Sequence, residues 1–393
     1  MLAKNFILII TPLPQKQAFF EPGACRLYTA TGIVIALRLL ILTLEACTAR
    51  HHTETGKIMK HKAVALISGG LDSILAAKLM LDMGIEVFGI NFIMPFDRPG
   101  SDTASRQDWA TRSASSLGIP LQSVPLGLDY MEMVRRPLHG YGKAINPCVD
   151  CHIFFLKKAG EHMRSIGADF LVTGEVIGQR PMSQRRDSMM LIERESGYAG
   201  LVLRPLSARY FESTIPEQNG WVDRDRLPGI KGRSRQSQFQ LAAACGITEY
   251  PNPAGGCLLT ELSFVPKVKD VFDHSSELEM RDFHLLKSGR HFRIGQHTKL
   301  ILGRNEADNH NLEAAFQPND TAICWMDGNT PLGLITGVQD QACLELAMRI
   351  LLRYTKAGRD SACRIMVRHN NTQQTRTVTH DISENEVASY RID

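Results

Sequence analysis

A turn rich in serine and glycine, residues 68–73 (Ser-Gly-Gly-Leu-Asp-Ser), carries one acidic side chain, Asp72. Backbone N–H groups in such a turn, at the positive end of a following helix, bind anions such as phosphates. A carboxylate would repel a phosphate unless a cation such as Mg²⁺ lies between them. The sequence therefore predicts a phosphate site with Asp72 as magnesium ligand; the alternative is that Asp72 or Ser73 only caps the helix.

Three cysteines form a second candidate set. Cys148 and Cys151 have C-x-x-C spacing just before an expected helix, and Cys257 ends the segment Pro-Asn-Pro-Ala-Gly-Gly-Cys. A helix N-terminus favours a thiolate. The pair is compatible with a redox disulfide, half of a zinc site or part of an iron–sulfur cluster. Zinc is disfavoured because the adjacent His152 would have to turn back onto the same metal.

Alternating apolar and helical segments must position these residues. Strands are expected over residues 63–67, 85–92, 119–124 and 168–173, and helices over 73–83, 103–117 and 152–166. This order predicts an α/β domain with a doubly wound parallel sheet at residues 59–275. Residues 68–73 and 173–184 would both lie at the carboxyl ends of strands, where such sheets bind ligands.

A second unit begins near His284, with short β-like segments and a helix-like segment at residues 341–354. We expect a small α+β domain at residues 284–355, followed by a polar and partly irregular tail at 356–393. Residues 1–58 are expected to be a poorly packed extension or a start-site artefact, because Met59 begins a short basic lead into the first strand.

The composition favours a reducing compartment. The nine cysteines are scattered and do not resemble a secreted disulfide framework. The apolar run at residues 32–44 is too short to span a bilayer and contains Arg38. A cytoplasmic protein without a membrane partner is expected, and its net charge of +4 permits a nucleic-acid partner.

Residues 68–73 resemble the SGGxDS signature of the PP-loop ATP pyrophosphatases, which have an adenine nucleotide alpha hydrolase-like fold. The turn lacks the Gly-Lys-Ser/Thr of a Walker A loop, which argues against γ-phosphate transfer. The resemblance implies cleavage of ATP between the α and β phosphates to adenylate a carbonyl oxygen.

Two further segments, 171–184 and 201–208, resemble the TGExxGQxxSQ loop and the LRPL segment of the tRNA 4-thiouridine synthase family. The residues Arg-Pro-Met at 180–182 depart from that loop by one extra, bulkier residue. The resemblance implies that the nucleotide is held by Ser68, Gly69, Gly70, Asp72, Ser73, Gly174, Glu175 and Gln179.

The family resemblance also implies roles for the three cysteines. In tRNA-thiolating relatives a C-x-x-C pair and a distant cysteine hold a four-iron, four-sulfur cluster with one open iron. By that resemblance Cys148, Cys151 and Cys257 would be catalytic and ligate iron. In a different branch two such cysteines act as a persulfide nucleophile and a resolving thiol, without metal.

Residues 287–304 contain five Lys or Arg and no acid, interleaved with Phe and His. Such a strip could contact RNA phosphates and stack on bases, or be a solvated basic face. Its Gly-Arg-Asn sequence resembles the NFACT-type RNA-binding domain, which implies RNA contacts from Arg290, Arg293, Lys299 and Arg304. A second basic segment, residues 230–238, either guides RNA or is solvated.

These features together favour ATP-dependent tRNA thiolation. A uridine carbonyl oxygen would be adenylated, pyrophosphate released, and the oxygen replaced by sulfur to give thiouridine and AMP. The expected partners are tRNA and a sulfur donor, either sulfide or a cysteine desulfurase; the expected cofactors are ATP, Mg²⁺ and the cluster. The alternatives are another adenylating ligase or amidotransferase and a non-catalytic RNA-binding adaptor. Whether C4 or C2 of uridine is modified stays open.

Overall fold

The computed structural model describes residues 60–96, 106–252, 256–328, 331–338, 340–370 and 372–392. The extension expected at residues 1–58 lies outside these ranges. Among the described residues, no helix is both long and apolar enough to cross a membrane.

The first sheet has five parallel strands in the order β3-β2-β1-β4-β5. They are β1 (Lys62–Leu66), β2 (Glu86–Ile93), β3 (Leu121–Pro125), β4 (Phe170–Val172) and β5 (Val202–Leu203). The chain builds outward from β1 to β3 on one side and from β4 to β5 on the other. The strand order therefore reverses at the carboxyl end of β1, where doubly wound sheets bind their ligands. The turn at residues 68–73 begins at this point.

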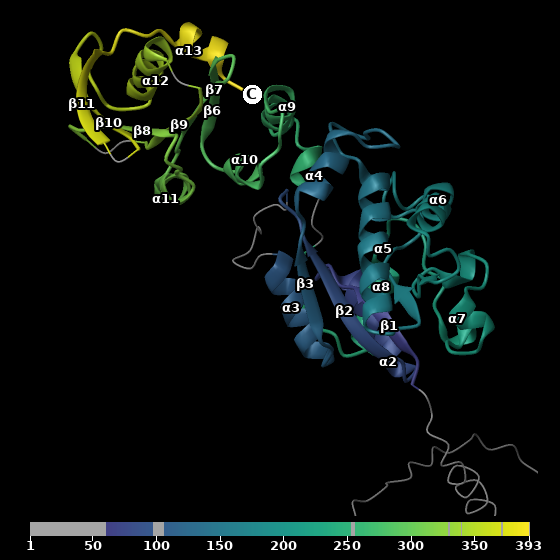
Figure 1. Ribbon diagram of the computed structural model, residues 1–393. Helices are drawn as coiled ribbons and strands as arrows, with labels where there is room; N and C mark the ends of the chain where they lie inside the picture. The colour runs from purple at the N-terminus through teal and green to yellow at the C-terminus, as the bar shows by residue number, and fades with distance from the viewer. Residues whose placement is uncertain are drawn as a thin grey trace, which may run out of the picture. The chain divides into compact units, whose positions relative to one another are not determined.

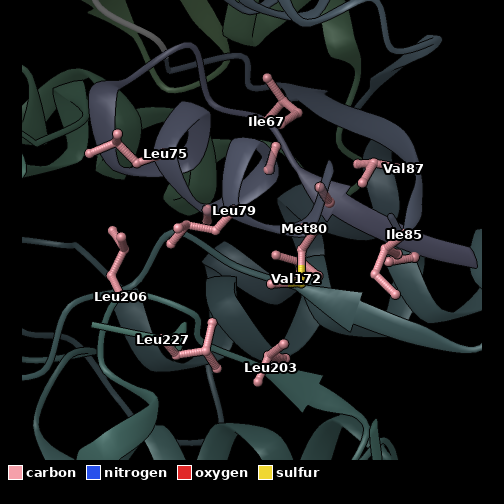
Figure 2. Packing of buried hydrophobic residues seen from close by; sticks show 14 of the residues in the cluster. Ile67, Leu75, Leu79, Met80, Ile85, Val87, Val172, Leu203, Leu206 and Leu227 are labelled. Atoms are coloured by element: carbon pink, nitrogen blue, oxygen red, sulfur yellow. The ribbon is translucent and has the colours of Figure 1, made fainter. Parts of the chain in front are cut away.

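Helices cover both faces of the sheet (Figure 1). They are α2 (Leu71–Asp82), α3 (Arg106–Leu117), α4 (Leu128–Arg135), α5 (Cys148–Ser165), α6 (Arg186–Ser196), α7 (Ile215–Gln218) and α8 (Gln236–Ala244). One core joins Leu75 and Met80 of α2 to Ile67, Val87 and Leu203, as Figure 2 shows. On the opposite face, Val64, Ile90 and Leu171 pack against Leu156 of α5. Burial on both faces explains why β1 is a continuous apolar run.

The predicted α/β domain with its doubly wound parallel sheet is confirmed, with one difference at the cysteines. Helix α5 begins at Cys148, not near residue 152. Pro147 occupies its N-cap, and Cys148 and Cys151 lie in its first turn. The cysteine pair is thus part of a helix whose buried residues Ile153, Leu156 and Met163 pack against the sheet.

Two helices follow Cys257: α9 (Val265–His274) and α10 (Met280–Leu285). Their side chains Val268, Phe272 and Phe283 share a core with Phe96 and with Tyr130 of α4. This core surrounds the segments that carry the cysteines.

Residues 290–392 form an α+β domain with a six-stranded antiparallel sheet in the order β11-β10-β8-β9-β7-β6. Its strands are β6 (Arg290–Gly295), β7 (Thr298–Leu302), β8 (Thr321–Trp325), β9 (Gly333–Gly337), β10 (Ala362–His369) and β11 (Thr372–Thr379). Its helices are α11 (Glu306–Ala314), α12 (Gln341–Arg353) and α13 (Glu384–Tyr390). The apolar face of α12 packs on the sheet through Ala347, Met348 and Leu351.

The domain expected to end at residue 355 continues through the polar tail at residues 356–393, of which residues 356–361 and 380–383 are irregular as expected. Strands β10 and β11 and helix α13 lie within it, and β10 pairs with β8 inside the sheet. In β10, Cys363, Ile365 and Val367 alternate with more exposed residues and contribute to the core. This alternation is typical of a half-buried strand, but the polar composition around it concealed the pattern.

We expect Ile365→Ala to destabilise this domain by about 2–5 kcal/mol, because a fully buried side chain would leave a cavity. Hydrogen exchange of the β8 and β10 amides measures the free energy of opening. Thr377→Ala, at an exposed position of the neighbouring strand β11, is the matched control and should change it little. Equal hydrogen-exchange protection in the two variants would contradict the finding that β10 belongs to the core of this domain.

Candidate nucleotide and cysteine site

The turn at residues 68–73 is held by its own serines. Ser73 Oγ donates to the carbonyl oxygen of Gly70 at 2.8 Å and lies 3.3 Å from Ser68 N. Gly69 has φ +76°, and a Cβ there would lie 2.7 Å from Ala110 N, so only glycine fits. No side chain caps α2 at Gly70. The simple capping explanation for Asp72 and Ser73 therefore fails, and the helix N-terminus can face an anion.

Asp72 is the centre of a mostly buried polar cluster. Its Oδ2 accepts hydrogen bonds from Gln179 Nε2 at 2.7 Å and from Arg235 Nη2 at 3.2 Å. Its Oδ1 is buried and has no hydrogen-bond partner. A buried carboxylate oxygen without a partner is costly, and a divalent cation would satisfy it. The donor chemistry of this carboxylate thus fits Mg²⁺.

Other side chains around Asp72 also have unsatisfied buried atoms. Gln238 Nε2 donates to Gln179 Oε1 at 2.9 Å. Arg235 Nε and Gln238 Oε1 are buried without hydrogen-bond partners, and so are Glu175 Oε1, Ser183 Oγ and Gln184 Oε1 on the loop at residues 173–184. Buried atoms of this kind are unusual in a folded protein, and a polar ligand would pair those near Asp72. Sequence reasoning missed Arg235 and Gln238 as site residues, although both lie in the basic segment 230–238.

Glu175 lies next to this cluster and is anchored by protein groups. Its Oε2 accepts hydrogen bonds from Thr173 Oγ1 at 3.0 Å and from Arg204 Nε at 3.2 Å. Its Oε1 lies 2.9 Å from His152 Nδ1. Burial alone would raise the pKa of Glu175, but His152, Arg204 and Thr173 outweigh it and lower the pKa to about 2. The carboxylate is therefore ionised; its Oε2 is hydrogen-bonded, and its Oε1, close to His152, is a buried oxygen without a hydrogen-bond partner.

Glu175 has a structural role in addition to the one expected for it. Its Oε2 is bonded within the protein, and the nucleotide contact that the family resemblance implied stays a prediction, for which Oε1 has no hydrogen-bond partner in the structure. Its neighbour Gly174 does touch the turn: a Cβ there would lie 2.5 Å from Ser73 N and from the carbonyl carbon of Asp72. Gly174 and Gln179 thus reach the turn directly, and Glu175 fixes the loop that carries them.

The three cysteines gather at the start of α5. Cys151 is buried, with its Sγ 3.3 Å from Tyr130 Oη, and Cys257 packs against the same core. Burial raises the pKa of the Cys151 thiol, and the charges of Cys148 and Cys257 raise this pKa further. Cys148 and Cys257 are therefore each within electrostatic reach of Cys151.

The expected thiolate at Cys148 is wrong for this conformation. Burial raises the pKa of Cys148, and a hydrogen bond with Asn146 and the charge of Arg180 lower this pKa only in part. Desolvation outweighs the helix N-terminus because the helix dipole is worth only about 0.3–1 kcal/mol. No disulfide joins any of the seven described cysteines.

Metal-ligand geometry is absent from the described part of the chain: no three His, Cys, Asp or Glu side chains there form a group that could hold a metal ion. His152 points to Glu175. The iron–sulfur cluster at Cys148, Cys151 and Cys257 stays a prediction.

Residues 180–182, where the sequence differs from the family loop, contact the segment before α5. A Cβ on Gly142 would lie 1.8 Å from Met182 Sδ, so Met182 is packed directly on Gly142. Arg180 lies within electrostatic reach of Cys148. The extra residue thus belongs to a loop that lies between the turn at residues 68–73 and the cysteines.

Three of the four basic residues expected to contact RNA have acidic partners from outside residues 287–304. Arg293 pairs with Asp270 at 2.7 Å, and Lys299, which is buried, pairs with the same carboxylate at 2.8 Å. Arg304 pairs with Asp308 at 2.7 Å. The Arg290 guanidinium lies 4.8 Å from the Tyr354 ring centroid. Arg293 and Lys299 therefore stabilise the fold here, and RNA contact by the four residues stays a prediction.

Comparison with known proteins identifies two segments. Residues 58–213 match the family model described as thiamine biosynthesis protein (ThiI). Over these residues the chain is similar to the ThiI family. Residues 289–391 match the NFACT protein RNA binding domain, which covers the C-terminal sheet and includes β10, β11 and α13.

Curated relatives match the ThiI-family part. The tRNA-specific 2-thiouridylase MnmA of Syntrophotalea carbinolica is 36% identical over 122 residues, which are 29% of this chain and 34% of the relative. The probable tRNA sulfurtransferase of Thermococcus kodakarensis is 29% identical over 147 residues, 37% of this chain and 36% of the relative. The chain spans about a third of the length of these relatives. A 4-thiouridine synthetase–RNA complex with bound ATP is 20% identical, with TM-score 0.31, over 48% of this chain and 52% of that chain.

We expect acid to weaken the α/β domain through Glu175. The pKa of Glu175 in the folded chain, about 2, is below its ordinary value of 4.5, so its contribution to stability is complete above about pH 4.5 and is lost as the pH falls toward 2. The full loss is on the order of 3 kcal/mol.

Urea unfolding between about pH 5 and pH 3 measures this effect. The free energy of unfolding should fall more steeply for the wild type than for Glu175→Gln. Glu161→Gln, at an exposed acid of α5, is the control and should keep the wild-type slope. Equal slopes of the free energy of unfolding against pH for the wild type and Glu175→Gln would rule out an ionised Glu175 in the folded chain.

Proposed function

We propose that this chain thiolates tRNA at the expense of ATP. The observation that carries the proposal is the position of the loop at residues 173–184, which contacts the turn at residues 68–73 through Gly174 and Gln179 and reaches the start of α5 through Glu175. A nucleotide on the turn would therefore lie near the cysteines. The relatives named as thiouridylase and sulfurtransferase support the same chemistry.

The nucleotide half of the reaction uses the N-terminus of α2. The backbone of residues 68–70 and the Ser73 hydroxyl would bind the phosphates, and Asp72 Oδ1 would hold Mg²⁺. The bound cation neutralises phosphate charge and so stabilises the pyrophosphate leaving group. The carbonyl oxygen of the target uridine attacks the α-phosphorus, the bond to the β-phosphate oxygen breaks, and pyrophosphate leaves.

The sulfur half replaces the adenylated oxygen. A persulfide on one cysteine, loaded by an external sulfur donor, attacks the activated carbon with its terminal sulfur, and AMP leaves with the oxygen. A second cysteine thiol then attacks the remaining S–S bond, which leaves thiouridine on the RNA and a disulfide between the cysteines. An external thiol must reduce that disulfide before the next turnover. An iron assay distinguishes this persulfide route from the iron–sulfur cluster predicted at the same cysteines.

The C-terminal domain would bring the RNA. The match to the NFACT RNA binding domain supports this role. Of the four basic residues expected to contact RNA, Arg290 and Arg304 keep partly exposed side chains. The position modified on uridine stays open, because the relatives carry both thiouridylase and sulfurtransferase names.

Asp72→Asn should lower pyrophosphate release from ATP and tRNA by at least about 100-fold, because the carboxylate that would hold the cation is lost. Anaerobic assays with ATP, Mg²⁺, sulfide and tRNA measure it directly. Asp82→Asn, at the exposed far end of the same helix, is the control. If the wild type releases no pyrophosphate, the non-catalytic RNA-binding alternative gains and thiolation fails.

With a cysteine desulfurase, cysteine and a reducing thiol as the sulfur supply, serine at either cysteine of the persulfide–resolving pair should abolish thiouridine formation. Pyrophosphate release should stay within about threefold of the wild type, because these thiols act after adenylation. Testing serine at Cys148, Cys151 and Cys257 in turn identifies the pair. Nucleoside mass spectrometry and an iron assay give the two readouts. Cys245→Ser, at the end of α8, is the control. Full activity in all three serine variants would instead favour an adenylating ligase that uses an amine.

A further inference from the structure

A short chain of contacts joins the nucleotide turn to the cysteine helix, and it passes through His152. We propose that His152 is a positioning residue that holds the cysteines in register with the nucleotide, so that adenylation leads to sulfur transfer and not to hydrolysis. This inference rests on the proposed thiolation. It concerns a residue for which neither the sequence motifs nor the family match provides a role.

The contacts are direct at each step. Gly174 lies against the backbone of Asp72 and Ser73, with no room for a Cβ. Glu175 follows in the chain, and its Oε1 lies 2.9 Å from His152 Nδ1. His152 is the residue after Cys151 in the first turns of α5. One side-chain contact therefore connects the loop that touches the nucleotide turn with the segment that carries the thiols.

The Glu175 end of this connection is rigid. Arg204, 3% exposed, donates to Glu175 Oε2, and its Nη1 donates to Glu193 Oε2. Glu193 Oε1 in turn accepts the backbone N–H of Gly200 at 2.7 Å. Each buried charge is paired, which fixes the carboxylate in one place. His152 has a side chain 29% exposed, so it extends from this buried anchor toward the open side.

Other contacts at the start of α5 hold a different segment. Asp150 accepts the backbone N–H groups of Leu138 and His139 at 3.0 and 3.1 Å, which fixes the preceding loop on the helix. Pro147 at the N-cap supplies no side-chain hydrogen bond. The contact of His152 with Glu175 is thus the polar side-chain contact that sets the start of α5 against the nucleotide loop.

The position of the cysteines relative to the nucleotide matters because the reaction has two steps: adenylation at the nucleotide turn and sulfur transfer at the cysteines. The adenylated uridine carbon can be attacked by sulfur or by water; attack by water expels AMP and restores uridine, so ATP is consumed without product. A displacement of about 1 Å between reacting groups can cost about 100-fold in rate. Loss of the His152 contact should therefore slow sulfur attack more than adenylation, which needs only the turn and the bound substrates.

The test is the ratio of thiouridine formed to pyrophosphate released, measured under anaerobic conditions with ATP, Mg²⁺, tRNA, a cysteine desulfurase with cysteine as the sulfur donor, and a reducing thiol. We expect His152→Ala to lower this ratio about 10- to 100-fold while pyrophosphate release stays within about threefold of the wild type. His152→Asn, which can place an amide N–H where Nδ1 lies, should restore most of the ratio. His162→Ala, in the last turn of the same helix, is the control and should keep it.

The inference is overturned if His152→Ala keeps the wild-type ratio. It is also overturned if His152→Ala and His152→Asn lose both activities equally, because that pattern indicates only a folding role. Failure of the proposed function gives a different result: the wild type itself releases pyrophosphate without forming thiouridine, or releases none.

Discussion

The buried carboxylate of Glu175 is the constraint on which the arrangement of this site depends. Taking an ion out of water costs several kcal/mol, and an ion pair repays this only when its hydrogen-bonding groups are satisfied. Here Thr173 and Arg204 engage one oxygen and His152 lies against the other, while Arg204 is paired again with Glu193. The network joins the loop after β4, helices α5 and α6 and the segment after β5: Thr173, His152 and Arg204 contact the Glu175 carboxylate, and Arg204 extends the network to Glu193 of α6.

Fixing Glu175 also fixes its neighbours on the loop at residues 173–184. Gly174 is pressed on the start of α2, and Gln179 bonds to Asp72. The same loop carries Arg180 and Met182, which reach Cys148 and Gly142. A change in the length of this loop would therefore alter both halves of the site together. The extra residue relative to the family motif is accommodated on the cysteine side, where Met182 replaces open space over a glycine.

Much of the parallel sheet and of the nucleotide turn could be predicted from the sequence, because their signals are local: an apolar run, a glycine turn and a helical repeat follow one another along the chain. Arg235 and Gln238 could not be assigned to Asp72, since they lie more than 160 residues away and only the fold brings them near. The same limit explains the basic strip. Asp270, which neutralises Arg293 and Lys299, lies outside the acid-free window and on a different element. Local charge counts describe composition, whereas tertiary pairing decides which charges stay free.

The cysteines illustrate how two correct local rules can oppose each other. A helix N-terminus lowers a thiol pKa and burial raises it. At Cys148 and Cys151 burial wins, and the mutual repulsion of thiolates adds to it at Cys151. The resting site therefore holds protonated thiols, which are poor nucleophiles and are slow to oxidise. For the proposed chemistry, a terminal persulfide sulfur has an advantage, because it extends the nucleophile one atom beyond the buried Sγ. Burial of the cysteine and reactivity of the transferred sulfur are then compatible within one site.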